Sequence, residues 1–247
     1  MAVHWGMIVL FTDFGLAGPY TGQMKAVLHE RAPQAEAIDL FADAPAGNPR
    51  AAAYLLAAYA AWFPPGTIFL CVVDPGVGGT RAPLAIEADG RWYVGPENGL
   101  FELVLRRAQT AQCHEISWRS QNLSASFHGR DLFAPVAAML AQGERPAMLA
   151  RAARRFPDWP DDLAEIVYID HYGNALTGLR AGAVAPAASL VIPNKMRVAH
   201  AATFSAVPEG SAFWYENSNG LVEIAVNRGR AADALGLAIG SRLSIAT

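Results

Sequence analysis

Residues 67–81 read TIFLCVVDPGVGGTR, an apolar run that ends in a carboxylate, a proline and a glycine-rich turn. A short, uniformly apolar run of this kind is typical of a strand that is buried on both faces of a sheet. Open α/β sheets bind ligands beyond the carboxyl ends of such strands. Asp74 lies at that end, and Arg81 can fold back across the glycines to pair with it. The same residues also fit a tight turn with a surface ion pair.

Predicted strands and helices alternate along the first part of the chain. Asn48 is a suitable N-cap, with Pro49 at the first position of the helix that follows it. Residues Ala88-Asp89-Gly90 suit a hairpin turn. This alternation predicts an α/β domain over residues 1–157, with helices flanking a mostly parallel sheet. We expect its strands at 7–11, 36–40, 67–73, 83–87 and 91–94, and its helices at 20–31, 49–62, 100–107 and 131–141.

The pattern changes after residues 156–162, a stretch rich in proline, aspartate and tryptophan that is typical of a linker. Short strands separated by turns follow it, and Ser218-Asn219-Gly220 is a hairpin signal. The sequence therefore predicts a smaller antiparallel β domain, barrel-like or sandwich-like, over residues 162–247. Its strands are expected at 165–169, 175–178, 189–192, 196–199, 212–216, 221–226 and 243–246.

Composition narrows the classes of function. The chain has 247 residues, of which 53% are hydrophobic and 17% charged, and its net charge of −3 gives no basic footprint for nucleic acid. The alanine-rich run at 51–61 is too short to span a bilayer, and we find no secretory signal. Cys71 and Cys113 are expected in buried strands as reduced thiols, which favours a cytoplasmic location. No cysteine or histidine pattern has the spacing of a zinc site.

Two further motifs of the first domain carry polar groups. Asp13 follows the first strand, where a carboxylate can accept hydrogen bonds from two ribose hydroxyls or can cap a helix. His128 precedes a glycine just before a predicted helix, so it is either a ligand contact or a structural side chain. Asp131 is expected to cap that helix, with Arg130 as its partner or as a structural anchor.

The second domain offers polar and aromatic groups on its turns. Asp170, Tyr172 and Asn174 supply a carboxylate for an ammonium group, a ring for stacking and a carboxamide for a base edge. Phe204 offers a second ring, while Ser218-Asn219 offers hydroxyl and amide donors. Aromatic side chains of β domains also belong often to the core, so either role fits each ring.

Taken together, these motifs resemble those of the S-adenosylmethionine (SAM) hydroxide adenosyltransferases, relatives of the fluorinase and chlorinase enzymes. The resemblance runs from Met7 to the last predicted strand. It implies a Rossmann-like N-terminal domain and a β-barrel C-terminal domain. It also implies a homotrimer with active sites between subunits, and conversion of SAM and water into adenosine and L-methionine without a metal or other cofactor.

The resemblance also implies roles for individual residues. Asp74, Arg81 and His128 match the set that holds the water or hydroxide nucleophile. The implied substrate contacts are Asp13 for the ribose, Asp170 for the methionine ammonium, Tyr172, Phe204 and Asn174 for the adenine, Ser218 for the methionine carboxylate, and the backbone around Asn227 and Arg228 for the adenine edge.

Departures from the halogenating relatives favour hydrolysis. Those enzymes have tyrosine where this chain has Asp74, and the fluorinase has arginine where this chain has Asn219. An anionic carboxylate repels a halide, whereas water can donate a hydrogen bond to it. Two alternatives are a halide adenosyltransferase and a non-catalytic sensor that binds SAM or adenosine.

Overall fold

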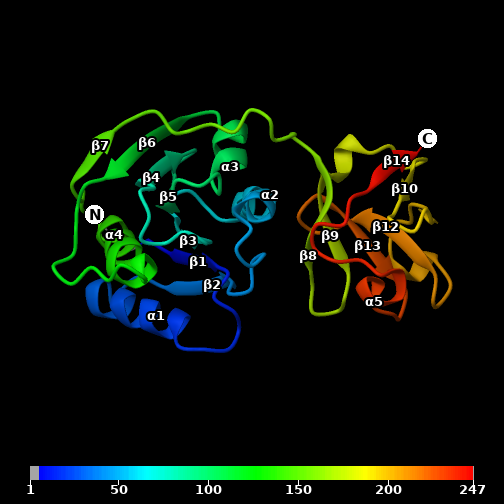
Figure 1. Cartoon of the computed structure of the whole chain (residues 1–247), viewed down its shortest axis with the longest axis horizontal. Helices are drawn as coiled ribbons and strands as arrows, with labels where there is room; N and C mark the ends of the chain where they lie inside the picture. The colour runs from blue at the N-terminus through cyan, green and yellow to red at the C-terminus, as the bar shows by residue number, and fades with distance from the viewer. Residues whose placement is uncertain (1–5, 247) are drawn as a thin grey trace. The chain divides into compact units, whose positions relative to one another are not determined.

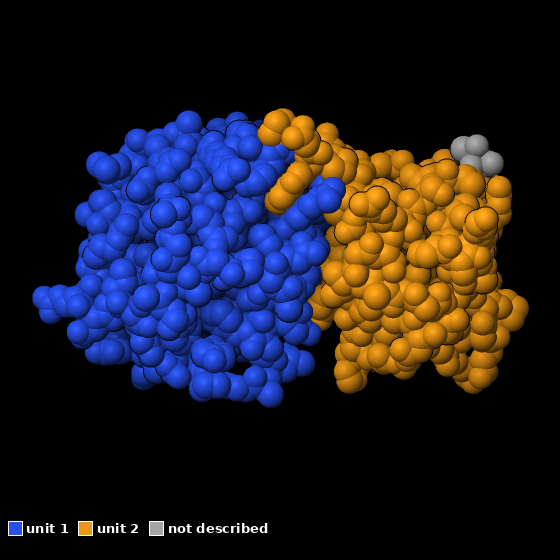
Figure 2. Space-filling model, viewed as in Figure 1, with its two compact units in different colours: residues 1–156 blue, residues 157–247 orange. Residues whose placement is uncertain are grey.

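The computed structural model describes residues 6–246 and divides the chain into two compact units, Met1–Phe156 and Pro157–Thr247 (Figure 2). Each unit has its own sheets and its own hydrophobic core. None of the helices in residues 6–246 is long and apolar enough to cross a membrane.

The first unit is built on one seven-stranded sheet, in the order β2-β1-β3-β5-β4-β6-β7 (Figure 1). β1, β2, β3 and β5 pair in parallel, as expected for strands joined through helices. The strands are β1 (Ile8–Thr12), β2 (Ala37–Phe41), β3 (Ile68–Val72), β4 (Pro83–Ala88), β5 (Arg91–Pro96), β6 (Ala111–Ile116) and β7 (Met148–Ala150).

The prediction of a mostly parallel sheet is confirmed only in part, because the sheet is mixed. β4 and β7 run against the other strands, so every pairing that they make is antiparallel. The predicted hairpin causes part of this reversal: Asp89 (φ 46°) and Gly90 (φ 74°) turn β4 directly back into β5. Cys71 is buried in β3, but Cys113 in β6 is only partly buried, contrary to the prediction.

Helices cover both faces of this sheet, which explains its uniformly apolar central strands. α1 and α4 pack together on one face, over Ile8 and Leu10, while α2 and α3 lie on the other (Figure 1). The Asn48 side chain caps α2 as predicted, accepting a 3.0 Å hydrogen bond from Ala51 N–H. The helices are α1 (Tyr20–Arg31), α2 (Pro49–Tyr59) with the 3₁₀ turn η1 (Ala60–Trp62), α3 (Glu102–Arg107), the π-helical turn η2 (Gly129–Phe133) and α4 (Ala134–Ala141).

The second unit contains all seven predicted strands. They form a four-stranded sheet, β12-β13-β9-β8, and a three-stranded sheet, β11-β10-β14. The strands are β8 (Leu163–Ile169), β9 (Ala175–Arg180), β10 (Ser189–Val191), β11 (Arg197–Val198), β12 (Ala212–Glu216), β13 (Leu221–Val226) and β14 (Ser244–Ala246). The helical segments are η3 (Ala181–Ala183), η4 (Phe204–Ala206) and α5 (Ala231–Leu235), none of which the sequence analysis predicted.

The pairing is antiparallel as predicted, but residues 157–246 form two sheets and no closed barrel. Single bridges join the sheet edges, Glu165 to Arg242 and His200 to Trp214, and neither extends into a ladder. The short β11 and β14 supply too few residues to continue the pairing. The core of this unit lies under one face of β13, centred on Val222, Ile224 and Trp214.

Candidate active site

The register of β1 and β3 places two carboxylates side by side at the carboxyl ends of these neighbouring strands. Thr12 pairs with Val72 in parallel, so Asp13 and Asp74 follow neighbouring strand ends. The Asp13 carboxylate accepts a 2.8 Å hydrogen bond from the Gly47 N–H. Burial raises the pKa of Asp13, hydrogen bonding to the backbone opposes this rise, and the charge of Asp74 adds to it. The two acidic groups therefore influence each other electrostatically.

Asp74 and Arg81 form the predicted ion pair. Arg81 Nη2 lies 2.9 Å from Asp74 Oδ1, and only 7% of the aspartate side chain is exposed, against 29% of the arginine side chain. Gly76 makes this geometry possible, because a Cβ at that position would overlap the Arg81 guanidinium. Asn98 braces the strand end by donating a 2.8 Å hydrogen bond to the Val73 carbonyl. The pair is therefore built into the glycine-rich loop, with the carboxylate largely shielded from solvent.

His128 lies on the same cavity as this ion pair. The cavity has a volume of about 210 Å³, and Asp74, Arg81 and His128 all line it. Sequence reasoning missed Arg119 and Leu123, which also line it. Arg119 donates hydrogen bonds from its guanidinium to the carbonyls of Ile116, at the end of β6, and of Trp118, at 2.5 and 2.8 Å.

The loop that carries His128 is fixed by Asp131. The prediction that Asp131 caps a helix is wrong, because its carboxylate accepts a 2.9 Å hydrogen bond from the Ser124 N–H behind it. Arg130 pairs with it as expected, at 2.6 and 2.9 Å. The hydrogen bond from Arg130 chiefly lowers the pKa of Asp131, burial opposes the effect, and Ser124 adds to it. The π-helical turn that follows His128 is a form often found at functional sites.

An aromatic group that sequence reasoning missed lies beside Gly129. Phe14, Tyr20 and Phe127 contact one another with ring centroids 5.5–5.8 Å apart. A Cβ on Gly129 would press against Phe14 and Phe127, so the glycine lets the His128 loop pack on these rings. Because the three rings come from separate segments, their contact cannot be predicted from the sequence.

In the second unit, Asp170 and Asn174 close one turn. Asn174 donates to the Asp170 carboxylate from its backbone at 2.8 Å and from its side chain at 3.2 Å. Asn174 is buried, whereas the Tyr172 ring between them is 74% exposed. The turn thus presents an aromatic ring to solvent and holds a carboxylate in a fixed orientation.

The remaining predicted contacts occupy neighbouring turns of the second unit. Phe204 is half-buried against Phe213 and Tyr215, with ring centroids 5.1 and 5.4 Å away. Ser218 and Asn219 form the tip of the β12–β13 hairpin, where Asn219 Nδ2 lies 3.2 Å from Ser218 Oγ.

Arg228 follows β13 in the left-handed region, with φ 56°, and its exposed side chain pairs with Glu209 at 3.1 Å. The neighbouring Asn227 uses its main chain within the unit: its N–H donates to Ser211 and its carbonyl accepts from Gly210. The backbone around both residues is the segment to which the family resemblance assigns contacts with the adenine edge.

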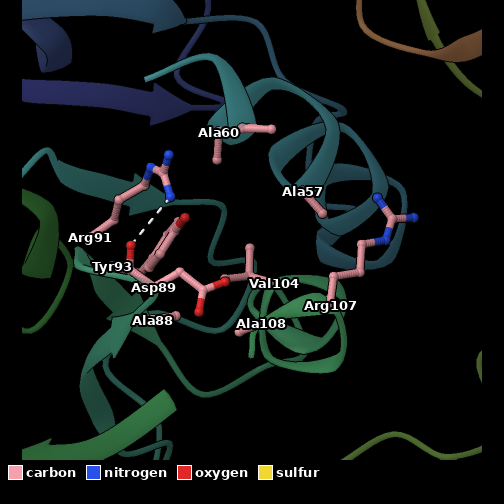
Figure 3. A pocket seen from close by; sticks show the side chains of 10 residues that line it. Ala57, Ala60, Ala88, Asp89, Arg91, Tyr93, Val104, Arg107 and Ala108 are labelled. Carbon is pink, nitrogen blue, oxygen red and sulfur yellow. Dashed lines mark hydrogen bonds between the residues drawn. The ribbon is translucent and has the colours of Figure 1, made fainter. Parts of the chain in front are cut away.

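A second cavity, of about 220 Å³, lies beside the β4–β5 turn, at the end of the first sheet where the parallel strand β5 begins (Figure 3). Alanines supply much of its lining: Ala57 of α2, Ala60 and Ala61 of η1, Ala88 of β4 and Ala108, which follows α3. Asp89 on its rim accepts hydrogen bonds from Gln109 N–H and Thr110 N–H, so its carboxylate serves the turn. The residues that line this cavity do not combine a carboxylate free of the turn with a histidine, as the first cavity does. The cavity lined by Asp74, Arg81 and His128 therefore remains the candidate active site. Within residues 6–246, no group of three or more His, Cys, Asp or Glu side chains is arranged to hold a metal ion.

Similarity to known protein families extends over both units. Residues 8–150 match the SAM hydroxide adenosyltransferase N-terminal domain, and residues 164–244 match the C-terminal domain of that family. The chain is 41% identical over 252 residues to the (R)-S-adenosyl-L-methionine hydrolase of Thermus thermophilus, which covers 93% of this chain and 95% of that protein. It is 36% identical to a protein of the same name from Salinispora arenicola, with 95% of each chain covered.

Two solved structures are similar to this chain over nearly its whole length. An uncharacterized conserved protein from Thermotoga maritima superimposes with a TM-score of 0.87 at 31% identity, covering 98% of this chain and all 100% of that one. A conserved hypothetical protein from Thermus thermophilus gives a TM-score of 0.76 at 34% identity, with 97% and 99% covered. With matches over both units and relatives above 30% identity along most of its length, the chain belongs to the SAM hydroxide adenosyltransferase family.

Proposed function

We propose that this protein hydrolyses SAM to adenosine and L-methionine. The observation that carries the proposal is the Asp74–Arg81 ion pair, which lines the same cavity as His128. The relatives named (R)-S-adenosyl-L-methionine hydrolase support the choice of substrate. Asp13, one strand away, is the proposed acceptor for the ribose hydroxyls.

In the proposed reaction, a water oxygen attacks C5′ in line with the C5′–S bond. The bonding pair leaves with sulfur, so the sulfonium becomes the neutral thioether of methionine, and Asp74 accepts the proton of the water. Arg81 orients Asp74 and stabilises its charge, and His128 positions the water or passes the proton on. Fixing a weak nucleophile in line is worth up to about 7–11 kcal/mol of the barrier. We propose no cofactor, because the sulfonium charge already makes methionine a leaving group.

The second unit would hold the rest of the substrate. Asp170 is the proposed partner of the methionine ammonium, and its fixed orientation on the Asn174 turn supports this. Asn174 would contact the adenine edge. Tyr172 and Phe204 are proposed to flank the adenine, Ser218 and Asn219 to contact the methionine carboxylate, and the main chain at Arg228 to contact the adenine edge.

A chromatographic assay tests the reaction. Purified protein incubated with SAM, without added metal or halide, is expected to release adenosine and methionine in equal amounts. Retention of the nucleoside without release of methionine would instead indicate a sensor. Repeating the assay with chloride and bromide tests the halide alternative, which would give a 5′-halogenated adenosine. The Asp74 carboxylate on the cavity argues against that product, because its charge would repel a halide there.

We also propose a homotrimer in which each active site combines the first unit of one subunit with the second unit of its neighbour. A head-to-tail interface forms a closed ring when the rotation between neighbouring subunits closes, which for a trimer is a threefold rotation. The proposed cytoplasmic location rests on the two free cysteines, Cys71 and Cys113.

Mixing two inactive variants tests the shared site. Asp74→Ala damages only sites built on the first unit of its own chain, and Asp170→Ala only those built on the second unit. Co-expressed subunits would therefore regain intact sites, and for random trimers we expect about a quarter of wild-type activity. Activity no higher than that of either variant alone would show that each site lies within one subunit.

A further inference from the structure

Glu223 is a buried acidic residue that neither the sequence motifs nor the proposed mechanism uses. It lies in the middle of β13, between Val222 and Ile224, which point into the core of the second unit. Its own side chain therefore points to the other face of the sheet, yet Glu223 is only 5% exposed. A carboxyl group at such a position needs partners to offset its lost hydration.

One partner connects Glu223 to the hairpin tip. Asn217 Nδ2 donates a 3.0 Å hydrogen bond to Glu223 Oε2. Asn217 Oδ1 in turn accepts hydrogen bonds from the N–H groups of Asn219 and Leu221, at 2.9 and 3.0 Å. Asn217 cannot flip its amide without losing both backbone bonds. The carboxylate thereby fixes the turn that presents Ser218 and Asn219.

The other contacts of Glu223 reach the aromatic group and the Asp170 turn. Its Oε1 accepts a 2.5 Å hydrogen bond from the Tyr215 hydroxyl, and the Tyr215 ring packs against Phe204. Burial raises the pKa of Glu223, hydrogen bonds from Tyr215 and Asn217 oppose this, the charge of Asp170 adds to the rise, and a hydrogen bond from Asn174 opposes it. One carboxyl group therefore adjoins three separate segments that carry predicted substrate contacts.

We propose that Glu223 is a positioning residue that holds the Asp170–Asn174 turn, the Phe204–Tyr215 rings and the Ser218–Asn219 turn in one arrangement for substrate binding. The proposal rests on the proposed function, because these segments are the contacts assigned there to SAM. Glu223 itself touches no reacting atom and acts through Asn217, Tyr215 and Asn174. It should therefore affect substrate affinity far more than the chemical step.

The raised pKa of Glu223 predicts that its ionised carboxylate costs stability in the folded state. A carboxyl whose pKa is raised in the folded state favours folding only while protonated, and that contribution disappears as the pH rises through its folded pKa. Near neutral pH, Glu223→Gln should therefore be at least as stable as the wild type. The difference should disappear below the ordinary glutamate pKa of 4.5. Marked destabilisation of Glu223→Gln near neutral pH would identify Glu223 as a support of the fold and overturn the proposal.

Steady-state kinetics of two variants test the role. Glu223→Leu removes every hydrogen bond to the carboxyl and should raise KM for SAM about tenfold or more, with kcat little changed. Glu223→Gln can keep its oxygen toward Asn217 and its amide toward the Tyr215 oxygen, so its KM should stay near the wild-type value. Partial unfolding would instead lower kcat at unchanged KM, because it reduces the fraction of active protein.

Glu102 provides a matched control in the first unit. It is also a buried glutamate, 2% exposed, but Arg106 and Arg155 lie 2.8 and 3.0 Å from its carboxylate. Burial raises its pKa, but the hydrogen bonds from Arg155 and Arg106 lower it overall. Glu102→Gln should therefore reduce stability near neutral pH and leave KM unchanged.

The outcomes separate this inference from the proposed function. An active wild type together with an unchanged KM in Glu223→Leu would overturn the positioning role alone. A wild type that releases no adenosine would overturn the proposed hydrolysis. The calorimetric Kd for SAM then takes the place of KM: weaker binding by Glu223→Leu would support the positioning role, and equal binding would overturn it.

Discussion

Asp74→Ala is expected to lower kcat about a hundred- to ten-thousandfold, the range for losing a group that accepts a proton in the transition state. KM should change much less, because the proposed mechanism places Asp74 against the attacking water and not against the bulk of the substrate. The variant should remain folded, since the loss removes an ion pair at a strand end and leaves the apolar core of β3 intact. Steady-state kinetics with SAM, supported by thermal unfolding, measure both effects.

A surface aspartate gives the matched control. Asp39 on β2 also pairs with a basic side chain, Lys25, but its own side chain is 41% exposed and lies outside the cavity. Asp39→Ala should keep wild-type kcat and KM. If Asp74→Ala also retained near-wild-type kcat, the role given to Asp74 as proton acceptor would be wrong.

Gly76→Ala should lower kcat about a hundredfold, the loss that a misplacement of about 1 Å can cause. The added Cβ would occupy the space of the Arg81 guanidinium. Because that group is the far end of a flexible side chain, it can swing away, and the fold should survive while the ion pair with Asp74 is lost. Kinetics and a crystal structure of the variant would test both parts.

Gly182→Ala is the control for this substitution. Gly182 lies on the turn η3 of the second unit, and no atom within 4 Å would meet its Cβ. It should therefore leave kcat and stability close to wild type. Full activity in Gly76→Ala, with Arg81 displaced from Asp74, would show that the ion pair is not needed for turnover.

The sequence predicted the parts of the fold whose signals are local. The uniformly apolar strand at β3, the Asn48 cap of α2 and the Asp89-Gly90 hairpin all lie where their residues indicated. Asp74 and Arg81 were also predictable as a pair, because the glycines between them allow the loop to fold back.

The parts that failed depend on contacts between distant segments. Sequence reasoning missed β7, and the predicted barrel is not closed, because both depend on tertiary pairing that the alternation of residues does not encode. Asp131 is a residue type that often caps helices, yet its carboxylate accepts a hydrogen bond from the N–H of Ser124, which precedes it in the chain. Glu223 resembles an exposed residue of an alternating strand, and only the fold shows that neighbouring turns cover it.

Hydrolysis in water labelled with ¹⁸O tests the central claim most directly. Wild-type protein and Asp74→Ala would be incubated with SAM, and the adenosine and methionine analysed by mass spectrometry. Attack of water on C5′ predicts one ¹⁸O in the 5′-hydroxyl of adenosine, unlabelled methionine, and almost no product from the variant. Unlabelled adenosine, or equal product from both proteins, would contradict attack by a water molecule held at Asp74.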